Sequence, residues 1–245
     1  MKKALLCLFV SVMGFAHAGA PASKNPTPVA PPQDDTLGFS LAAGYDTSYI
    51  FRGVDFGDNL VWAGLTVPIK LTDKATFTFA PWYGSIAGEE YDELDLVASL
   101  TYDLGFATVG VGYTWYYFPF SGFETSEPNV TIAKSFAGIN WYAGAYLDLE
   151  ADNGTEGWYF ETGLNYPIKI TEKFSLVPEA KVSYAEDYYG VSGFNNVVVK
   201  LSAPYALTSR ATIAPYIAAS FAVDGLEDIG EEDYLIGGVA LTVTF

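Results

Sequence analysis

The chain of 245 residues is half hydrophobic and 16% aromatic, and this composition excludes a protein that is disordered throughout. Its 12 Lys and Arg residues against 29 Asp and Glu residues give a net charge of −17 at pH 7. A surface this acidic repels phosphate groups, so we expect no nucleic-acid partner. The one Cys (Cys7) and the one His (His17) both lie in the first 18 residues.

The first 18 residues have the pattern of a signal peptide. Two lysines are followed by an apolar stretch over 4–15 and then by the small-residue sequence Ala-His-Ala over 16–18. The apolar stretch is too short to cross a bilayer as a helix. We therefore predict a signal peptide over 1–18, whose removal leaves an exported chain without Cys or His.

Residues 19–36 are rich in proline and contain Val29 as their one large apolar residue. Segments of this composition form extended linkers, because they cannot bury enough apolar surface to pack into a core. The sequence predicts a periplasmic linker over 19–36, followed by one β-barrel domain over 37–245.

From residue 37 onward the hydrophobic pattern has a period of two. In the last segment, Leu235, Val239 and Leu241 share one face, whereas Thr242 and Thr244 lie on the other. No run of 18 apolar residues interrupts the pattern. The alternating segments are 37–52, 59–71, 74–86, 92–104, 106–118, 129–137, 139–150, 157–170, 173–185, 195–207, 210–223 and 233–245.

The length of these twelve segments favours strands that cross a membrane. Strands of soluble sheets usually have about 5–6 residues, whereas a tilted transmembrane strand needs about 9–11. We therefore predict an all-β fold, a transmembrane antiparallel up-and-down β-barrel of 12 strands. A soluble β-sandwich is the alternative, and it would have shorter strands.

The connections between the segments differ at the two ends of the predicted barrel. Five are tight turns, at 72–73, 105, 138, 171–172 and 208–209. Six are longer and acidic, at 53–58, 87–91, 119–128, 151–156, 186–194 and 224–232. Short turns at one end and longer loops at the other are typical of outer-membrane barrels. An even number of strands then places both termini at the periplasmic, short-turn end.

One strand-turn-strand unit occurs three times, at 67–83, 166–180 and 203–217. Repetition of a hairpin suits a barrel meander, but each unit also carries a proline in mid-strand (Pro81, Pro178, Pro215), where a ladder hydrogen bond is lost. Aromatic residues gather near strand ends and predict two interfacial belts. We place Tyr49, Phe51, Trp115, Tyr117, Trp158 and Phe160 near the loops, and Tyr102, Trp141, Tyr166, Phe174 and Tyr205 near the turns.

The segment Tyr-Asp-Thr-Ser-Tyr-Ile-Phe-Arg-Gly-Val over 45–54 resembles the opening-strand motif of the TorF-type outer-membrane porins. This resemblance implies an outer-membrane β-barrel with a pore role. The C-terminal Phe245 ends an alternating apolar face and resembles the signal by which the barrel-assembly machinery recognises its clients. We therefore expect the bacterial outer membrane as the location, with its lipids and that machinery as partners.

The residue types available after the signal peptide argue against an enzyme. Outer-membrane barrel enzymes generally use a histidine as acid or base, and none remains after residue 18. Zinc sites lose their usual ligands for the same reason. We expect no catalytic residues, no cofactor and no metal site. Calcium binding by the acidic loop 224–232 is a weaker alternative, because its spacing differs from an EF-hand.

Charged residues on the inward parity of the strands predict the functional surface. A charge in mid-strand must face the interior, because its exposure to lipid is costly. The predicted channel-lining residues are Asp46, Arg52, Asp95, Asp148, Glu161, Glu179, Lys181 and Lys200. Their excess of acids predicts a narrow channel for small solutes that prefers cations. The alternative is a closed structural or adhesion barrel, with Glu179, Lys181 and Lys200 locked in salt bridges.

Overall fold

The computed structural model describes residues 38–152 and 154–245. The predicted signal peptide over 1–18 and the linker over 19–36 lie outside the described residues, so both boundaries remain predictions. Within the described ranges, no helix is both long and apolar enough to cross a membrane.

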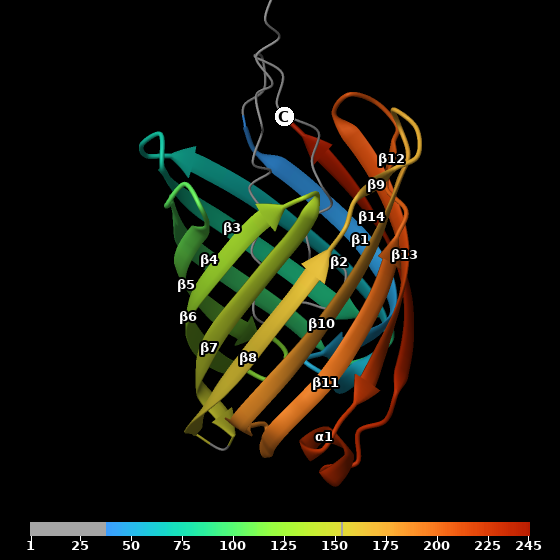
Figure 1. The fold of residues 1–245 in the computed structure, drawn as a ribbon. Coiled ribbons are helices and arrows are strands. Elements are labelled where there is room, and N and C mark those ends of the chain that lie inside the picture. Colours follow the sequence, from blue (N-terminus) through green and yellow to red (C-terminus); the bar gives the residue numbers. More distant parts are fainter. Residues whose placement is uncertain (1–37, 153) are drawn as a thin grey trace, which may run out of the picture.

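The described chain is a closed antiparallel β-barrel (Figure 1). Its strand segments are β1 (Ser40–Phe51), β2 (Val54–Lys70), β3 (Ala75–Ile86), β4 (Asp92–Asp103), β5 (Thr108–Phe118), β6 (Phe123–Phe136), β7 (Ile139–Asp152), β8 (Thr155–Asn165), β9 (Ile168–Lys169), β10 (Ser175–Tyr188), β11 (Val191–Ser202), β12 (Tyr205–Ala206), β13 (Ala211–Ala222) and β14 (Tyr234–Thr244). The two-residue segments β9 and β12 continue β8 and β11, so the barrel has 12 strands, as the alternation predicted.

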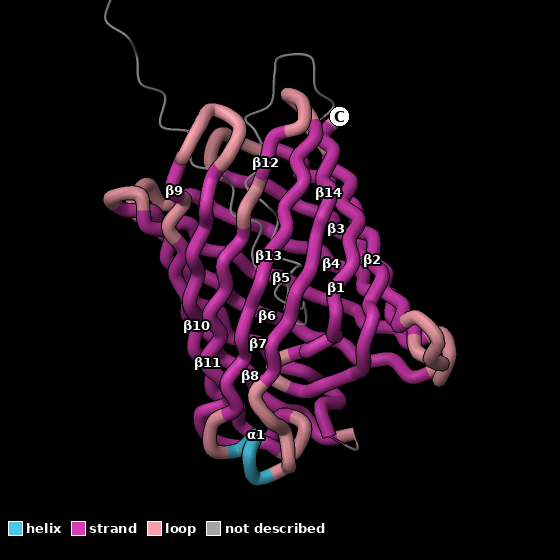
Figure 2. Tube along the Cα trace, turned by 90° about the vertical axis from the view of Figure 1, so that its right-hand side faces the viewer, coloured by secondary structure: helices cyan, strands magenta, loops and turns pink. Residues whose placement is uncertain are grey.

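The pairing follows the chain order around the barrel. Each strand pairs with the next one along the sequence, and β14 pairs with β1 from Ser40↔Thr244 to Asp46↔Gly238. This last pairing closes the ring, so the sheet leaves no strand edge without a partner. Both ends of the described chain lie at the end of the barrel that carries the tight turns, opposite the short helix α1 (Gly225–Asp228), as Figures 1 and 2 show.

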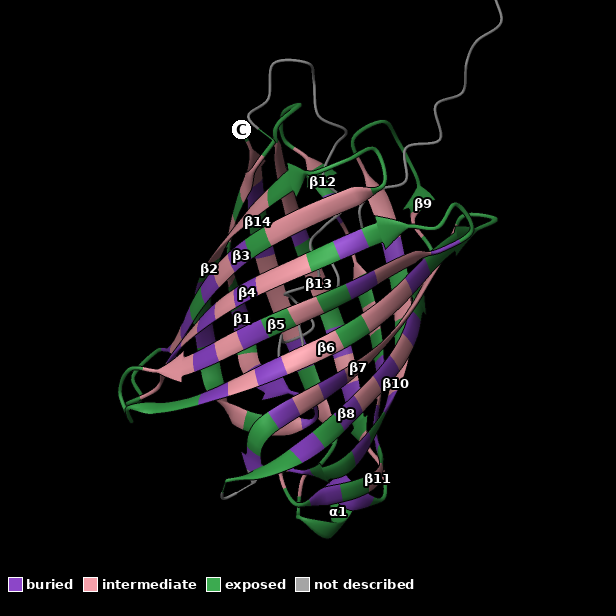
Figure 3. Cartoon of the chain, turned by 90° about the vertical axis from the view of Figure 1, so that its left-hand side faces the viewer, coloured by how far each residue is buried: buried purple, intermediate pink, exposed green. Residues whose placement is uncertain are grey.

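Alternation along each strand separates an apolar outer face from the interior, and Figure 3 shows the resulting stripes of exposed and buried residues. On β14, Leu235 and Leu241 are 72% and 43% exposed, whereas Ile236 and Ala240 are buried. The period of two places these pairs on opposite faces of the sheet. The outer surface of the barrel is therefore the apolar one, as a bilayer requires.

Four of the six loops opposite the tight turns are shorter than the sequence predicted, whereas strands flank the predicted loops 87–91 and 224–232 without entering them. The chain passes from β1 to β2 at Arg52 and Gly53, and from β10 to β11 at Tyr189 and Gly190. All four residues have positive φ, between 51° and 92°, as two-residue hairpin turns require. The predicted loops 53–58, 119–128 and 186–194 were therefore largely wrong: their polar residues belong to strand ends that pair across the hairpin.

The mid-strand prolines lie where the ladder is interrupted. Pro178 of β10 lies opposite the break between β8 and β9, which Pro167 itself occupies. Its carbonyl still accepts a hydrogen bond of 3.1 Å from the Tyr166 backbone amide. Pro215 lies opposite the break between β11 and β12, and its carbonyl accepts from the amide of Ala203 at 2.9 Å. At the two breaks the neighbouring strand needs no hydrogen bond from a proline, which has no N–H group to donate. The barrel therefore stays closed.

A β-bulge corrects the prediction for two aromatic residues of the loop-side belt. The register of β1 against β2 shifts between Ser48 and Ile50. A bulge changes which side chains face inward. Before it, Tyr45 is 39% exposed on the outer surface; after it, Tyr49 and Phe51 are 1% and 4% exposed. These two rings therefore lie inside the barrel and not in the belt.

The remaining belt residues are distributed as a bilayer interface favours. Near the tight turns, Tyr102, Tyr166 and Tyr205 are each 43–45% exposed. Near the loops, the rings of Trp115 and Tyr117 stack at 5.4 Å between centroids, and those of Trp158 and Phe160 stack at 5.7 Å. Paired aromatic residues at both ends are the pattern of interfacial girdles.

Replacing Phe245 by Asp should lower the yield of folded barrel. The Phe245 ring stacks on Phe39 at 4.9 Å between centroids, and the Phe245 amide donates to the Phe39 carbonyl at 2.9 Å. The measurement is the fraction of protein in outer-membrane preparations that runs as the compact, heat-sensitive band on a gel. Phe136→Asp is the control, because Phe136 is a 50% exposed residue at the same end of the barrel. An equal loss for both variants would show that the C-terminal position has no special role.

Candidate functional site

All eight residues predicted to line the interior are directed into the barrel. They are Asp46 on β1, Arg52 in the β1–β2 turn, Asp95 on β4, Asp148 on β7, Glu161 on β8, Glu179 and Lys181 on β10, and Lys200 on β11. The first five are at most 7% exposed. The side chains of Glu179, Lys181 and Lys200 are 10%, 19% and 7% exposed. Whether any of them lines a path for solutes remains a prediction.

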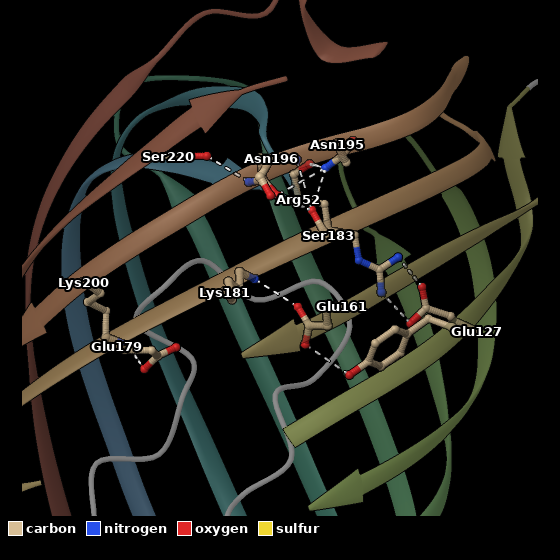
Figure 4. A network of polar contacts seen from close by, with 11 residues as sticks. Arg52, Glu127, Glu161, Glu179, Lys181, Ser183, Asn195, Asn196, Lys200 and Ser220 are labelled. Atoms are coloured by element: carbon tan, nitrogen blue, oxygen red, sulfur yellow. Dashed lines mark hydrogen bonds and ion pairs between the residues drawn. The ribbon is translucent and has the colours of Figure 1, made fainter. Parts of the chain in front are cut away.

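An ion pair crosses the interior between Arg52 and Glu127 of β6 (Figure 4). The two guanidinium nitrogens lie 2.7 and 3.0 Å from the two carboxylate oxygens, and the side chains are 3% and 0% exposed. The guanidinium carbon also lies 4.1 Å from the ring centre of Tyr159 and 4.7 Å from that of Tyr188. This bidentate pair is therefore held in an aromatic environment, where charged hydrogen bonds are strong and the loss of one partner is costly.

The backbone of Arg52 is fixed by a polar cluster on β10, β11 and β13. The Asn195 side-chain amide of β11 donates to the Arg52 carbonyl at 2.6 Å. Next to it, Asn196 donates to the Ser220 hydroxyl at 2.9 Å, and the Ser183 hydroxyl donates to the Asn196 side chain. The β1–β2 turn is thus anchored to strands on both sides of the barrel (Figure 4).

The sequence predicted one cluster of salt bridges among Glu179, Lys181 and Lys200. The structure has two separate ion pairs instead. Lys200 pairs with Glu179 at 3.5 Å, directly across the β10–β11 ladder. Lys181 instead reaches Glu161 of β8 at 3.0 Å, and the Tyr146 hydroxyl donates to the same carboxylate at 3.3 Å. Figure 4 shows the two pairs as separate contacts. The expected association of Lys181 with Glu179 is therefore replaced by an ion pair with the neighbouring strand.

Acids elsewhere in the interior accept hydrogen bonds from neutral donors. Asp46 accepts from the Trp62 indole at 2.9 Å and from the Tyr216 hydroxyl at 2.7 Å. Asp148 accepts from the Thr125 hydroxyl. Neutral donors stabilise a buried carboxylate but do not cancel its charge. These acids therefore contribute a negative potential to the interior.

Two buried acids were missed by the sequence analysis. Glu93 of β4 has the same parity as Asp95, two residues on, and this signal was available in the sequence. Glu127 was assigned to the predicted loop 119–128, yet it lies within β6. The structure makes Glu127 the partner of Arg52, which is 75 residues away in the chain. No pattern of spacing indicates such a pair.

Aromatic side chains fill the interior near the loops and form the loop-side aromatic cluster. Its buried rings are Tyr49, Phe51, Trp62, Trp82, Tyr146, Tyr159 and Tyr188, with Phe56, Tyr91 and Tyr189 packed against them. Some ring contacts join strands that do not neighbour one another and therefore cross the interior. The centroid of the Phe51 ring lies 6.5 Å from that of Tyr116 on β5 and 6.2 Å from that of Tyr189. The cluster therefore constricts the barrel at this level.

A small cavity remains within the cluster beside Glu93. Its volume is about 10 Å³, and its walls include Tyr49, Tyr91 and Glu93. The hydroxyl groups of both tyrosines donate to the Glu93 carboxylate, that of Tyr91 at 3.1 Å. Burial, and after it the Glu93 charge, raises the pKa of Tyr91 in the loop 87–91, so its phenol is protonated at neutral pH.

The candidate calcium loop gains no support from the structure. Across residues 38–152 and 154–245, no group of three or more His, Cys, Asp or Glu side chains is placed to hold a metal ion. Part of the loop folds instead into α1, whose Leu226 is fully buried in the loop-side core.

Comparison with solved structures places the fold among outer-membrane channels. The barrel is similar to an outer-membrane channel from Pseudomonas putida F1, with a TM-score of 0.58 and 12% identity over 92% of this chain and 99% of that one. It is also similar to the KdgM porin, with a TM-score of 0.55 and 8% identity over 84% and 99% of the two chains. The NanC porin gives a TM-score of 0.51 and 12% identity over 84% and 98%. No protein-family model and no curated protein sequence matches the chain.

Replacing Glu127 by Gln should lower the free energy of unfolding by about 3–5 kcal/mol, because it leaves the buried Arg52 charge without its counter-ion. Urea unfolding in detergent micelles, followed by Trp fluorescence, measures the change. Glu124→Gln, on the exposed start of the same strand, is the control and should change stability by less than about 1 kcal/mol.

The double variant Arg52→Met with Glu127→Leu separates charge from packing. Apolar replacement of a whole buried ion pair is often neutral, so the double variant should recover most of the stability that Glu127→Gln loses. If Glu127→Gln were as stable as the wild type, the buried Arg52 charge would not need Glu127 as its counter-ion, and the prediction would be wrong.

Proposed function

We propose that the protein is an outer-membrane barrel that forms a narrow channel for small solutes and prefers cations. The excess of acids in the interior is the observation that carries this proposal. The inward-facing charged residues on the described strands and turns are the acids Asp46, Glu93, Asp95, Glu127, Asp148, Glu161 and Glu179 and the bases Arg52, Lys181 and Lys200. Seven acids against three bases give the interior a negative potential, which attracts cations and repels anions.

The fold and the outer surface support the location. The most similar structures include an outer-membrane channel and two porins, and the outer face here is apolar with aromatic residues at both ends. We propose the bacterial outer membrane, with its lipids and the barrel-assembly machinery as partners. The TorF-type porins remain the proposed family, on the strength of the motif over 45–54. The proposal includes no enzymatic activity, since residues 19–245 contain no His or Cys.

The channel must be narrow because the loop-side aromatic cluster constricts it. Twelve strands enclose less space than the 16–18 of large porins, and large side chains take up part of that space. Solutes that pass the Arg52–Glu127 pair must be small or must displace it. The closed structural or adhesion barrel is the second candidate, and this cluster is the observation that favours it.

We expect single-channel currents with a cation-selective reversal potential. The purified barrel is inserted into a planar lipid bilayer that separates two KCl concentrations, and the reversal potential gives the ratio of K⁺ to Cl⁻ permeability. Anion preference would refute the cation-channel proposal. The absence of conductance, from protein that shows the compact band on a gel, would establish the closed-barrel candidate instead.

Replacing Glu179 by Gln should lower the K⁺ to Cl⁻ permeability ratio. The substitution removes one interior acid, which pairs with Lys200 at 3.5 Å, and so makes the interior less negative. The reversal potential in the same KCl gradient measures the change. Glu156→Gln, on the exposed start of β8, is the control and should have a smaller effect, because salt screens charges beyond about 8–10 Å. An unchanged ratio with a lower thermal stability would show that the Glu179–Lys200 pair is only a structural contact.

A further inference from the structure

We propose that the small cavity in the loop-side aromatic cluster binds the ammonium group of a primary amine. This loop-side cavity is lined by Tyr49, Phe56, Tyr91, Glu93, Tyr116 and Phe118, among others. Binding requires only the fold, whereas the role of the bound amine as a transported solute rests on the proposed function.

The volume of the cavity limits the group that fits. About 10 Å³ accommodates the centre of one water-sized group and little more. A primary ammonium group has roughly the size of a water molecule. A trimethylammonium group is several times larger and would have to displace the surrounding rings. The size therefore favours a primary amine over a quaternary one.

Glu93 supplies the charge that selects a cation. It is the one acidic or basic residue among those that line the cavity, and it is 2% exposed. Tyr49 and Tyr91 both donate to its Oε2 atom. Both of these hydrogen bonds go to Oε2, so Oε1 is the acceptor that we assign to an ammonium N–H group. A buried carboxylate with an open acceptor excludes anions and favours a cationic donor.

The aromatic walls complete the environment of the cation. The Tyr49 ring lies 5.5 Å from that of Phe56 and 5.8 Å from that of Tyr91, measured between centroids. Aromatic faces attract a desolvated ammonium group. The Tyr91 phenol oxygen, which donates its proton to Glu93, keeps lone pairs that accept from a further donor. The site thus offers both acceptors and π faces.

The same barrel already holds one cation by this chemistry. The Arg52 guanidinium pairs with Glu127 and lies 4.1–5.2 Å from the centres of four rings, those of Phe51, Tyr146, Tyr159 and Tyr188. Phe51 and Tyr116 belong both to the surroundings of Arg52 and to the wall of the cavity. The loop-side cavity repeats the combination of a buried carboxylate and aromatic rings, without a protein cation in its lining.

A row of rings connects the cavity with the surface and suits an apolar tail. The ring of Tyr91 lies 5.9 Å from that of Phe118, which lies 5.7 Å from that of Phe123. Exposure rises along this row, from half-buried Tyr91 and Phe118 to Phe123 at 46%. A short alkyl or aryl chain attached to the ammonium group would pack along Phe118 and Phe123. The ligand class is therefore a primary amine with a short apolar tail.

Isothermal titration calorimetry tests this site with the full-length purified barrel in detergent micelles. The probe is n-butylammonium chloride, and n-butanol and tetramethylammonium chloride are the comparison compounds. We expect saturable binding of n-butylammonium and at least tenfold weaker binding of both comparison compounds. Equal binding of n-butanol would show that the charge is irrelevant, and equal binding of tetramethylammonium would contradict the size argument.

Glu93→Gln and Glu90→Gln provide the matched pair of variants. Glu93→Gln keeps the shape of the side chain but removes its charge and should weaken binding at least tenfold. Glu90→Gln removes an exposed charge three residues away in the same hairpin and should change the affinity less than twofold. Binding that survives Glu93→Gln would overturn the proposal. If Glu93→Gln does not give the compact band on a gel, Phe56→Leu decides: it leaves Glu93 in place, and unchanged binding in it would also overturn the proposal.

Conductance separates this site from the channel itself. Current in KCl without n-butylammonium binding would refute the site and leave the channel proposal intact. Binding without current would support the site and favour the closed barrel. Binding together with a concentration-dependent block of K⁺ current would support both, because the bound amine then occupies the conducting path.

Discussion

Closure of the strand ladder is the constraint on which the rest of this structure depends. A sheet in a bilayer has no water to satisfy its backbone, so every N–H and C=O group must find a partner in a neighbouring strand. The pairing of β1 with β14 meets this demand, and the broken ladders at Pro178 and Pro215 are tolerated because each carbonyl still accepts a hydrogen bond. Closure also gives each side chain only two environments, lipid or interior. Charged side chains therefore gather inside.

Charged side chains in a narrow interior need counter-ions and hydrogen-bond partners. The side chains that supply these contacts fill part of the barrel and so constrict it. Arg52 needs Glu127, and both need aromatic and polar neighbours that replace water. Most of the groups that surround Arg52 come from strands that do not neighbour β1, so their contacts cross the interior. These contacts reduce the width of any path through the barrel. The Arg52 carbonyl is held by Asn195 in the same way. The proposed cation preference and the constriction thus have the same origin, which is one arrangement of buried charges.

The period of two was sufficient to predict the class of fold, the number of strands and the inward direction of the seven charged residues that lie on strands. Each of these depends on local alternation alone. The pairing of charges could not be predicted, because it depends on distance across the barrel. Lys181 binds Glu161 and not Glu179, and Glu127 lies within a strand where the sequence predicted the loop 119–128. The prediction of loop lengths was wrong for a related reason. Polar residues at strand ends pair as well as apolar ones once the hairpin has formed.

The register shift between β1 and β2 shows how a single local irregularity can determine which side chains face the interior. Without the register shift between Ser48 and Ile50, Tyr49 and Phe51 would continue the lipid-facing row that begins with Leu41. With it, both rings enter the interior, where Tyr49 donates to Glu93 and Phe51 contacts Arg52. The aromatic constriction and the cavity beside Glu93 thus arise from the same shift. Toward the tight turns, where β1 keeps its alternation, the interior instead presents Asp46 and the Glu179–Lys200 pair. The interior therefore offers carboxylates at one level and aromatic rings with carboxylates at the next.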